Sequence, residues 1–509
     1  MPYPAFVWLI AILLGAAPLV YLSGRLAHNR PFHRRSVARW AAVVAFGVAW
    51  SPYLYALSAL NSQGTVTFTL GVVSLRADGL SILLAGLVLV LGTLVTLFSA
   101  PSMAGESGES KYYAMIVALS GVMIGLGCAG DLFNLWLWFE AMAVSSYLLV
   151  AFYRDESASL EAGFKYLVQS AIGSVLVLLA IALVLAETGT LDLLEIHEAT
   201  ATMPGLSFLL AAGALFVVGF GVKVALVPLH TWLPDAHAQA PSGVSALLSG
   251  VVIEAGLVAL LRALGSIAAV IGGGQGPLDW GILLLSFGLL NMIAGNLLAL
   301  RQTQVKRMLA YSSLTHMGYM LVGIGVALHA GQVAGAEGGL FHLLSHGLMK
   351  GLAFLAAGAL LYVLHSALGD HGPLTIAELG GAAQRYPLLA LALSVALLGL
   401  GGLPPFVGFM SKWQILVAGV ATQELWIVGV VIFAALNSVF SLAYYAPVVN
   451  VMYRSKTSPV VQAGASAPAL LQAPLVLLIV GTVAGGVWPA LVQGLTGPAA
   501  TALLTAFSG

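Results

Sequence analysis

Apolar stretches recur along the whole chain, and each is about as long as the roughly 20 residues that an α-helix needs to cross a bilayer. Of the 509 residues, 60% are hydrophobic and only 7% are charged. Soluble domains carry about 25% charged residues, and single soluble cores stop growing at about 250–300 residues. We therefore expect an all-α integral membrane protein that folds as one polytopic membrane domain over residues 1–509.

The apolar stretches divide into about fourteen transmembrane helices, whose ends the sequence fixes only to within a few residues. They are centred near residues 13, 49, 88, 121, 141, 175, 215, 253, 290, 318, 350, 400, 435 and 482. No basic residue precedes the first stretch, 6–22, and no small-residue cleavage site follows it, so we expect a retained helix rather than a signal peptide. Residues 62–77 alternate β-branched and polar side chains between glycines, which predicts a short hairpin outside the membrane.

Basic residues indicate how the chain is oriented in the bilayer. They gather in loops that follow odd-numbered spans, whereas loops after even-numbered spans are acidic or neutral, as at 187–198. The basic residues of the odd loops are Arg25, Arg30, Arg34, Arg35, Arg39, Arg154, Lys165, Arg301, Lys306, Arg307, Arg385, Arg454 and Lys456. Because basic loops stay on the cytoplasmic side, we expect both termini to lie outside a bacterial cytoplasmic (inner) membrane.

Several ionisable side chains lie inside predicted spans, where a charge costs about 2.5–3.5 kcal/mol on insertion scales. Such residues persist only with compensation or for a function. Glu140 in span five is one of them. It is either an inert, hydrogen-bonded carboxyl or, as we favour, a carboxylate whose charge a nearby lysine stabilises. Moving the lysine's charge away would then favour protonation of the carboxylate.

Two spans contain a lysine beside a proline break. Lys223 lies in span seven ahead of Pro228. Lys412 follows Pro404 and Pro405 in span twelve. Proline removes a backbone donor and clashes with the preceding turn, so both helices are expected to break, although a simple kink with a snorkelling lysine is an alternative for span seven.

Breaks at corresponding positions of two halves are typical of transporters built on inverted repeats. The pattern predicts two inverted five-helix repeats, spans four to eight and nine to thirteen, with helices seven and twelve broken. The expected boundaries are 1–100 for the first three helices, 111–270 and 279–450 for the repeats, and 470–493 for the last helix.

Three residues of span eleven, His342, His346 and Lys350, are spaced by four and therefore share one helix face. Together with His316 of span ten they supply groups that can change charge near neutral pH. No carboxylate lies within one turn of either span-eleven histidine. We therefore favour a proton relay over structural hydrogen bonding and over a metal site, and assign no metal ligands.

His230, Asp235 and His237 follow the break of span seven near its cytoplasmic end. They either brace the broken helix or take up protons from the cytoplasm, and the sequence favours neither interpretation.

Five segments across spans five to twelve resemble the antiporter-like subunits shared by respiratory complex I, membrane-bound hydrogenases and Mrp-type sodium/proton antiporters. The segments are DLFNLWLWFEAMAVSSYLL at 131–149, GVKVALVPLHTWLPDAHAQAPSGVSALLSG at 221–250, NLLALRQTQVKRMLAYSSLTHMGYM at 296–320, HGLMKGLAFLAAGAL at 346–360 and GLPPFVGFMSKW at 402–413. The resemblance implies fourteen helices in two inverted repeats. It also implies a Glu–Lys pair, here Glu140 and Lys223, and a polar axis along the membrane midplane to Lys412.

The chain departs from this family at two positions. The family usually carries a lysine in the middle of helix eight, where this chain has Glu254. Either the relay runs through a carboxylate at that step, with Lys223 or Lys350 as its partner, or the central connection is altered. In helix thirteen, Tyr445 leads into Ala446 rather than into the arginine that often follows in the family, which weakens the carry-over of the family's exit path.

Three functions remain open. The chain is a proton-translocating subunit of a complex I-type (NADH-quinone oxidoreductase) redox-driven pump, a subunit of an Mrp-type sodium/proton antiporter, or a non-pumping membrane scaffold. We favour the first, because a scaffold has no reason to keep buried ionisable residues.

Other classes of function find no support in the sequence. Nineteen basic residues balance nineteen acidic ones, so no basic tract suggests nucleic acid. The single cysteine, Cys128, excludes an internal disulfide and a cysteine-based metal site, and no dinucleotide fingerprint or haem site is present. We expect no cofactor in this chain. Redox energy would come from partner membrane subunits, with this chain as the translocase component for protons, or for sodium in the alternative.

Overall fold

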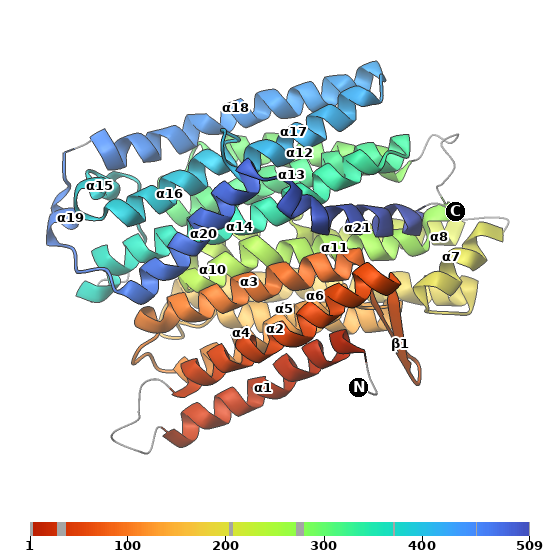
Figure 1. The fold of residues 1–509 in the computed structure, drawn as a ribbon, viewed down its shortest axis with the longest axis horizontal. Helices are drawn as coiled ribbons and strands as arrows, with labels where there is room; N and C mark the ends of the chain where they lie inside the picture. The colour runs from red at the N-terminus through yellow and green to blue at the C-terminus, as the bar shows by residue number, and fades with distance from the viewer. Residues whose placement is uncertain are drawn as a thin grey trace.

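The structure is a computed structural model that describes residues 4–27, 37–202, 207–270, 279–369, 372–454 and 456–507. Long helices lying side by side form nearly all of it, with one small hairpin at the edge (Figure 1). The helices up to the first break are α1 (Ala5–Ala27), α2 (Val37–Gln63), α3 (Gly79–Ser102), α4 (Glu109–Gly127), α5 (Leu132–Val150), α6 (Ser157–Thr188), α7 (Leu193–Thr202) and α8 (Ser207–Val224).

The helices between the two breaks are α9 (Leu233–Gln239), α10 (Ser242–Leu247), α11 (Ile253–Ser266), α12 (Trp280–Ala299), α13 (Val305–Ala330), α14 (Val333–Leu364), α15 (Ala382–Arg385) and α16 (Pro387–Leu400). A π-helical turn, η1 (Leu248–Val252), joins α10 to α11. The short 3₁₀ turns are η2 (Ala268–Val270), η3 (Ser366–Leu368) and η4 (Ala377–Leu379). The last helices are α17 (Val407–Ala421), α18 (Leu425–Arg454), α19 (Pro459–Ala463), α20 (Ala469–Val487) and α21 (Ala490–Phe507).

The all-α membrane fold is confirmed. Twelve helices within the described ranges are long and apolar enough to cross a membrane, and every predicted span centre falls in a helix. The expected single last helix over 470–493 is wrong, because α20 ends at Val487 and α21 follows it. Pro489 disfavours helical backbone at Trp488, which ends α20 there. Of the predicted cytoplasmic arginines, Arg30, Arg34 and Arg35 lie outside the described residues.

The predicted hairpin is present. Strands β1 (Val66–Leu70) and β2 (Val73–Ala77) pair antiparallel, with Val66 opposite Ala77. The backbone N–H of Arg76 donates to Cys128 O at 2.6 Å, which fastens the hairpin to the end of α4. Because α3 follows β2 almost directly, the hairpin also fixes where α3 begins.

The first predicted break separates α8 from α9, and partners satisfy the backbone groups that it frees. The Asn291 side chain on α12 accepts from Val227 N at 2.8 Å and donates to Ala225 O at 3.2 Å. Trp232 Nε1 donates to Val222 O at 2.7 Å. Non-helical backbone is tolerated at membrane depth only where protein or a wet cavity supplies such partners.

The second predicted break separates α16 from α17 at the double proline 404–405. Lys412 Nζ donates to Leu400 O at 2.7 Å. Ser438 Oγ donates to Gly401 O at 2.9 Å. An amide and an indole therefore satisfy the first break, whereas an ammonium group and a hydroxyl satisfy the second.

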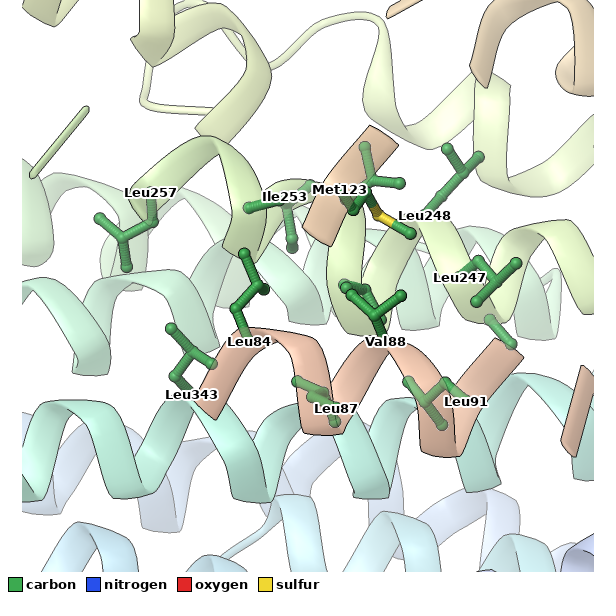
Figure 2. Packing of buried hydrophobic residues seen from close by; sticks show 14 of the residues in the cluster. Leu84, Leu87, Val88, Leu91, Met123, Leu247, Leu248, Ile253, Leu257 and Leu343 are labelled. Carbon is green, nitrogen blue, oxygen red and sulfur yellow. The ribbon is translucent and has the colours of Figure 1, made fainter. Parts of the chain in front are cut away.

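The centre of the bundle is tightly packed where α3, α4, α10, α11 and α14 meet. Figure 2 shows apolar side chains of α3 directed between the neighbouring helices. The labelled side chains are Leu84, Leu87, Val88, Leu91, Met123, Leu247, Leu248, Ile253, Leu257 and Leu343. Every residue of 243–266 is buried, so ionisable groups on α11 lie inside protein and not against lipid.

A buried ion pair that the sequence did not suggest joins the start of α3 to α11. Arg262 donates to Asp78 through Nη1 at 3.1 Å and through Nη2 at 2.9 Å. Its Nη2 also donates to Gly127 O at 2.6 Å and to Ser81 Oγ at 2.8 Å. Burial alone would raise the pKa of Asp78, which caps α3, but Arg262 and Arg76 outweigh burial and hold that pKa below its usual value.

Replacing Asp78 by asparagine should lower the free energy of unfolding by about 3–5 kcal/mol, because Arg262 then keeps a buried charge without its partner. The lowered pKa sets the direction of the pH effect. The stabilisation is complete above the unfolded-state pKa of about 3.9 and is lost as the pH falls through the folded-state value. Thermal unfolding in detergent measures both effects, with the exposed Asp155→Asn as control. Equal stability of the two variants would show that the pair does not stabilise the fold.

Candidate functional site

Lys223 is fully buried at the end of α8 and points into the protein, so it does not snorkel. Its Nζ donates to Tyr166 OH at 2.8 Å and to Ser170 Oγ at 3.4 Å, both on α6. It lies 4.3 Å from the Tyr166 ring centroid and 5.8 Å from those of Phe139 and Trp232. Hydroxyl oxygens and ring faces thus stabilise an ammonium group that is kept out of water.

Glu140 on α5 is near enough for its charge to act on Lys223. The described residues contain no direct ion pair between the two side chains. Glu140 is only partly buried, and its Oε2 lies in the protein without a hydrogen-bond partner. A carboxylate placed near its lysine but not against it can change its charge state or its partner without breaking an existing hydrogen bond.

Glu254 on α11 and His346 on α14 form a pair in the middle of the bundle. Glu254 Oε1 and His346 Nδ1 lie 2.7 Å apart, and neither side chain is exposed. Both partners that the sequence suggested for Glu254 are wrong: within the described structure Lys223 and Lys350 each donate to hydroxyl groups elsewhere. The remaining atoms of the pair, Glu254 Oε2 and His346 Nε2, are buried and have no partner.

Two further histidines extend this pair toward the second break. His316 Nδ1 and His342 Nε2 lie 3.0 Å apart, and His342 Nδ1 lies 2.9 Å from Ser411 Oγ. The His316 and His346 ring centroids are 5.3 Å apart. An imidazole that accepts a proton on one nitrogen can release one from the other, so these rings can pass a proton along. The Tyr319 ring lies 5.4 Å from that of His342 and 4.6 Å from Lys412 Nζ, so the line ends near Lys412.

Lys350 joins the same line through two hydroxyl groups. Its Nζ donates to Leu309 O at 2.7 Å and to Ser312 Oγ. Ser312 Oγ lies 2.5 Å from Tyr445 OH, which in turn lies 3.5 Å from His316 Nε2. Each hydroxyl can donate and accept at once, so the connection from the lysine to the histidine is made of groups that can exchange protons.

Lys412 on α17 occupies a place at the second break that resembles that of Lys223 at the first. Its Nζ donates to Ser438 Oγ at 2.7 Å and lies 4.6 Å from the Tyr319 ring centroid. A cavity of about 170 Å³ with mainly apolar walls borders this lysine. Both breaks therefore combine a buried ammonium group, a hydroxyl and an aromatic ring.

The three polar residues after the first break do not form one group. Asp235 bridges Lys165 at 3.0 Å and Arg307 at 2.8 Å, which braces α6, α9 and α13 against one another. His237 is fully buried; its Nδ1 contacts a backbone carbonyl one turn back, and its Nε2 has no partner. His230 is half-buried, and its Nδ1 is unpartnered. Of the three residues, Asp235 is therefore the one that braces the helices around the first break.

Several residues of the site were not predicted. The hydroxyl groups come from Tyr166, Ser170, Ser312, Ser411, Ser438 and Tyr445. Serine and tyrosine are common in membrane helices, and only the packing shows which of them face a lysine or histidine. Lys306 was assigned to a loop, but it lies in α13, is buried and donates to Ala240 O at 2.6 Å. No group of three or more metal-ligating side chains is found in the part of the chain that the structure describes.

A bundle of long apolar helices, two of them interrupted beside buried lysines, defines a polytopic membrane subunit of the transporter class. The profile of the family described as "NADH:quinone oxidoreductase/Mrp antiporter, TM" matches residues 129–438. The chain therefore belongs to the NADH:quinone oxidoreductase/Mrp antiporter family of membrane subunits.

The relatives include NADH-quinone oxidoreductase subunit N of Salinibacter ruber, 32% identical over 464 residues that cover 88% of each chain. F(420)H(2) dehydrogenase subunit N of Methanosarcina mazei is 31% identical over 441 residues, which cover 84% of this chain and 85% of that protein. Hydrogenase-4 component B of Escherichia coli is 35% identical over 373 residues, 71% of this chain and 53% of that protein.

Solved structures with a similar fold include chains from three kinds of membrane complex. A chain of the archaeal membrane-bound sulfane sulfur reductase matches with a TM-score of 0.85 and 27% identity over 99% of both chains. A chain of complex I from Thermus thermophilus matches with a TM-score of 0.72 and 26% identity, covering 94% of this chain and 98% of that one. A chain of the Mrp complex from Dietzia shares the fold, with a TM-score of 0.82 at 22% identity.

Replacing Trp232 by phenylalanine should lower the free energy of unfolding by about 1–3 kcal/mol, because Val222 O loses its buried donor at the first break. Thermal unfolding in detergent tests this, and Trp413→Phe, which changes an exposed indole at the second break, is the control. If both variants unfold at the parent temperature, the indole does not support the broken helix.

Proposed function

We propose that this chain is a proton-translocating, antiporter-like membrane subunit of a complex I-type, redox-driven pump. Family membership and the subunit N relatives, which align over most of both chains, support the proposal. The observation that carries it is a buried series of exchangeable groups between the two broken helices. The series consists of Glu254, His346, His316, His342 and Ser411, with Lys223 and Lys412 at the breaks.

Charge would move along this series in short steps. Glu140 changes the electrostatic field at Lys223, so protonating or moving one of them alters the charge that the other can hold. Gly256 on α11 lies against the side chain of Lys223, which leaves no room for another side chain between the first break and the helix that carries Glu254. From Glu254 onward, carboxyl, imidazole and hydroxyl groups can receive a proton on one atom and release one from another.

The chemistry of the series favours protons over sodium. Its ionisable groups are mainly lysine and histidine nitrogens, which carry protons, whereas hard cations prefer oxygen ligands. Glu254, the buried carboxyl group of the series, already uses Oε1 for His346. An Mrp-type sodium/proton antiporter remains the second candidate, because the Dietzia Mrp chain shares this fold.

A non-pumping scaffold is the third candidate. A scaffold needs shape alone, and buried charges then only destabilise it. Five charged groups and three histidines nevertheless remain in or beside the midplane series. Their retention supports transport over a purely structural role.

The energy for transport would come from other subunits, since the motifs of this chain suggest neither a flavin nor an iron–sulfur site. The relatives named above are subunits of larger membrane complexes, and we infer the same kind of partners here. From the basic residues of the odd loops we infer that those loops lie in the cytoplasm and that both termini lie outside the cytoplasmic membrane. Determining on which side of the membrane a cysteine tag at each terminus lies would test this topology.

Glu140→Gln and Lys223→Ala should each abolish proton translocation in vesicles while the complex still assembles, because the coupled charges of the first half are then lost. Quenching of a pH-sensitive dye under turnover measures translocation, and blue native electrophoresis measures assembly. Glu187→Gln, which changes an exposed carboxyl on α6, is the matched control. Normal pumping by both variants would remove the pair from the mechanism.

Glu254→Gln keeps the shape of the side chain but cannot exchange a proton with His346, so translocation should fall by roughly tenfold or more. Glu254→Lys introduces the residue usual in the family and tests whether the position requires a carboxylate. Full activity of Glu254→Lys would show that any charge suffices there. Full activity of Glu254→Gln would exclude the central pair from the path.

A further inference from the structure

A hollow of about 130 Å³ lies at the end of the bundle where the loops after odd-numbered spans meet. The end of α3, the link between α9 and α10, the start of α13 and the segment after α14 form its walls. In the proposed orientation all of these loops are cytoplasmic. Its polar lining includes Glu156, Gln239, Gln304 and Lys306.

Lys306 is turned away from the surface into this hollow. Its side chain is buried, and Nζ donates to Ala240 O at 2.6 Å and to Ala238 O at 3.3 Å. A lysine that only marks the cytoplasmic side of a membrane protein normally extends into water. Carbonyl oxygens at the end of α9 hold this ammonium group in place, but among the described residues no carboxylate pairs with it.

The groups beyond Lys306 lead inward to the midplane series. Lys306 bonds to the carbonyl of Ala238, the residue after His237. The His237 ring lies 5.4 Å from that of Phe354, one turn beyond Lys350 on α14, so His237 lies between the helices that carry the two lysines. His237 Nε2 is completely buried and has no hydrogen-bond partner. On α13, the residues at 306, 309, 313 and 316 share one face, and Lys350 bonds to Leu309 O on it.

We propose that Lys306 is the group through which the chain takes up protons from the cytoplasm, with His237 passing them to Lys350. This inference rests on the proposed transport function. In each cycle the Lys306 ammonium gives one proton to His237 Nε2, and the neutral amine takes one from water in the hollow. From Lys350 the proton continues through Ser312 and Tyr445 to His316.

The polar residues near the first break differ in role. Asp235 is engaged by Lys165 and Arg307 and braces the helices. His237 and Lys306 have no such opposite partner among the described residues, so a proton can arrive and leave.

Cysteine accessibility tests the hollow independently of transport. The chain has one cysteine, Cys128, which is buried, so the parent protein should not react. Ser102→Cys and Lys306→Cys place thiols in the lining of the hollow, and a membrane-impermeant maleimide should label both in inverted vesicles and neither in right-side-out vesicles. Ser394→Cys, the same exchange at a buried position of α16, should stay unlabelled. If assembled Ser102→Cys and Lys306→Cys complexes are not labelled, the hollow is not open to the cytoplasm and the proposed proton inlet is wrong.

Transport by Lys306 variants then tests the proton step. Arginine keeps the charge and the hydrogen bonds to carbonyl oxygens but cannot release its proton, so Lys306→Arg should assemble and lose roughly tenfold or more of the translocation rate. Lys306→His retains an exchangeable proton and should recover part of the rate. Arg385→Lys is the control, since Arg385 likewise bonds loop carbonyls on the same face. A parent rate in Lys306→Arg would reduce Lys306 to a cap on the C-terminal end of α9, even if Glu140 and Lys223 prove essential.

Discussion

An ammonium group inside a membrane needs partners before the helices around it can close, and this requirement organises the structure. Lys223 finds hydroxyl groups and ring faces, while Lys412 also takes a carbonyl that the broken helix has released. Helix interruption and charge burial are therefore one arrangement: the break exposes backbone dipoles, and the charge or its neighbours satisfy them. Prolines alone would leave two defects, and lysines alone would leave two unsolvated charges.

At the centre of the molecule, the buried ionisable groups pair with each other rather than with a lysine. Glu254 and His346 can share a single proton, so the pair need not hold a net charge in surroundings that water does not reach. Leucines of α3 and α11 pack into the apolar core beside this part of α11 (Figure 2). The apolar core thus does more than stabilise the fold, because low polarity strengthens each electrostatic interaction along the series.

Much of this arrangement could be predicted from the sequence. Apolar length located the helices, Pro228 and Pro404 located the breaks, and the spacing of His342 and His346 placed them on one face. The partner of Glu254 could not be predicted, because it depends on how α11 is rotated against α14. Arg262 and the hydroxyl groups were missed for a similar reason: their roles arise from contacts between segments far apart in the chain.

The π-helical turn η1 sets the rotational phase of the helix that follows it. Each residue of an α-helix advances the side chains by about 100°, so closing Leu248–Val252 into a regular α-helical turn with the same number of residues would swing all of α11 around its axis. Glu254 would then point away from His346, and a bulkier neighbour would replace Gly256 against Lys223. The wide turn is therefore what lets one continuous helix present Glu254 to α14 and Gly256 to Lys223 at the same time.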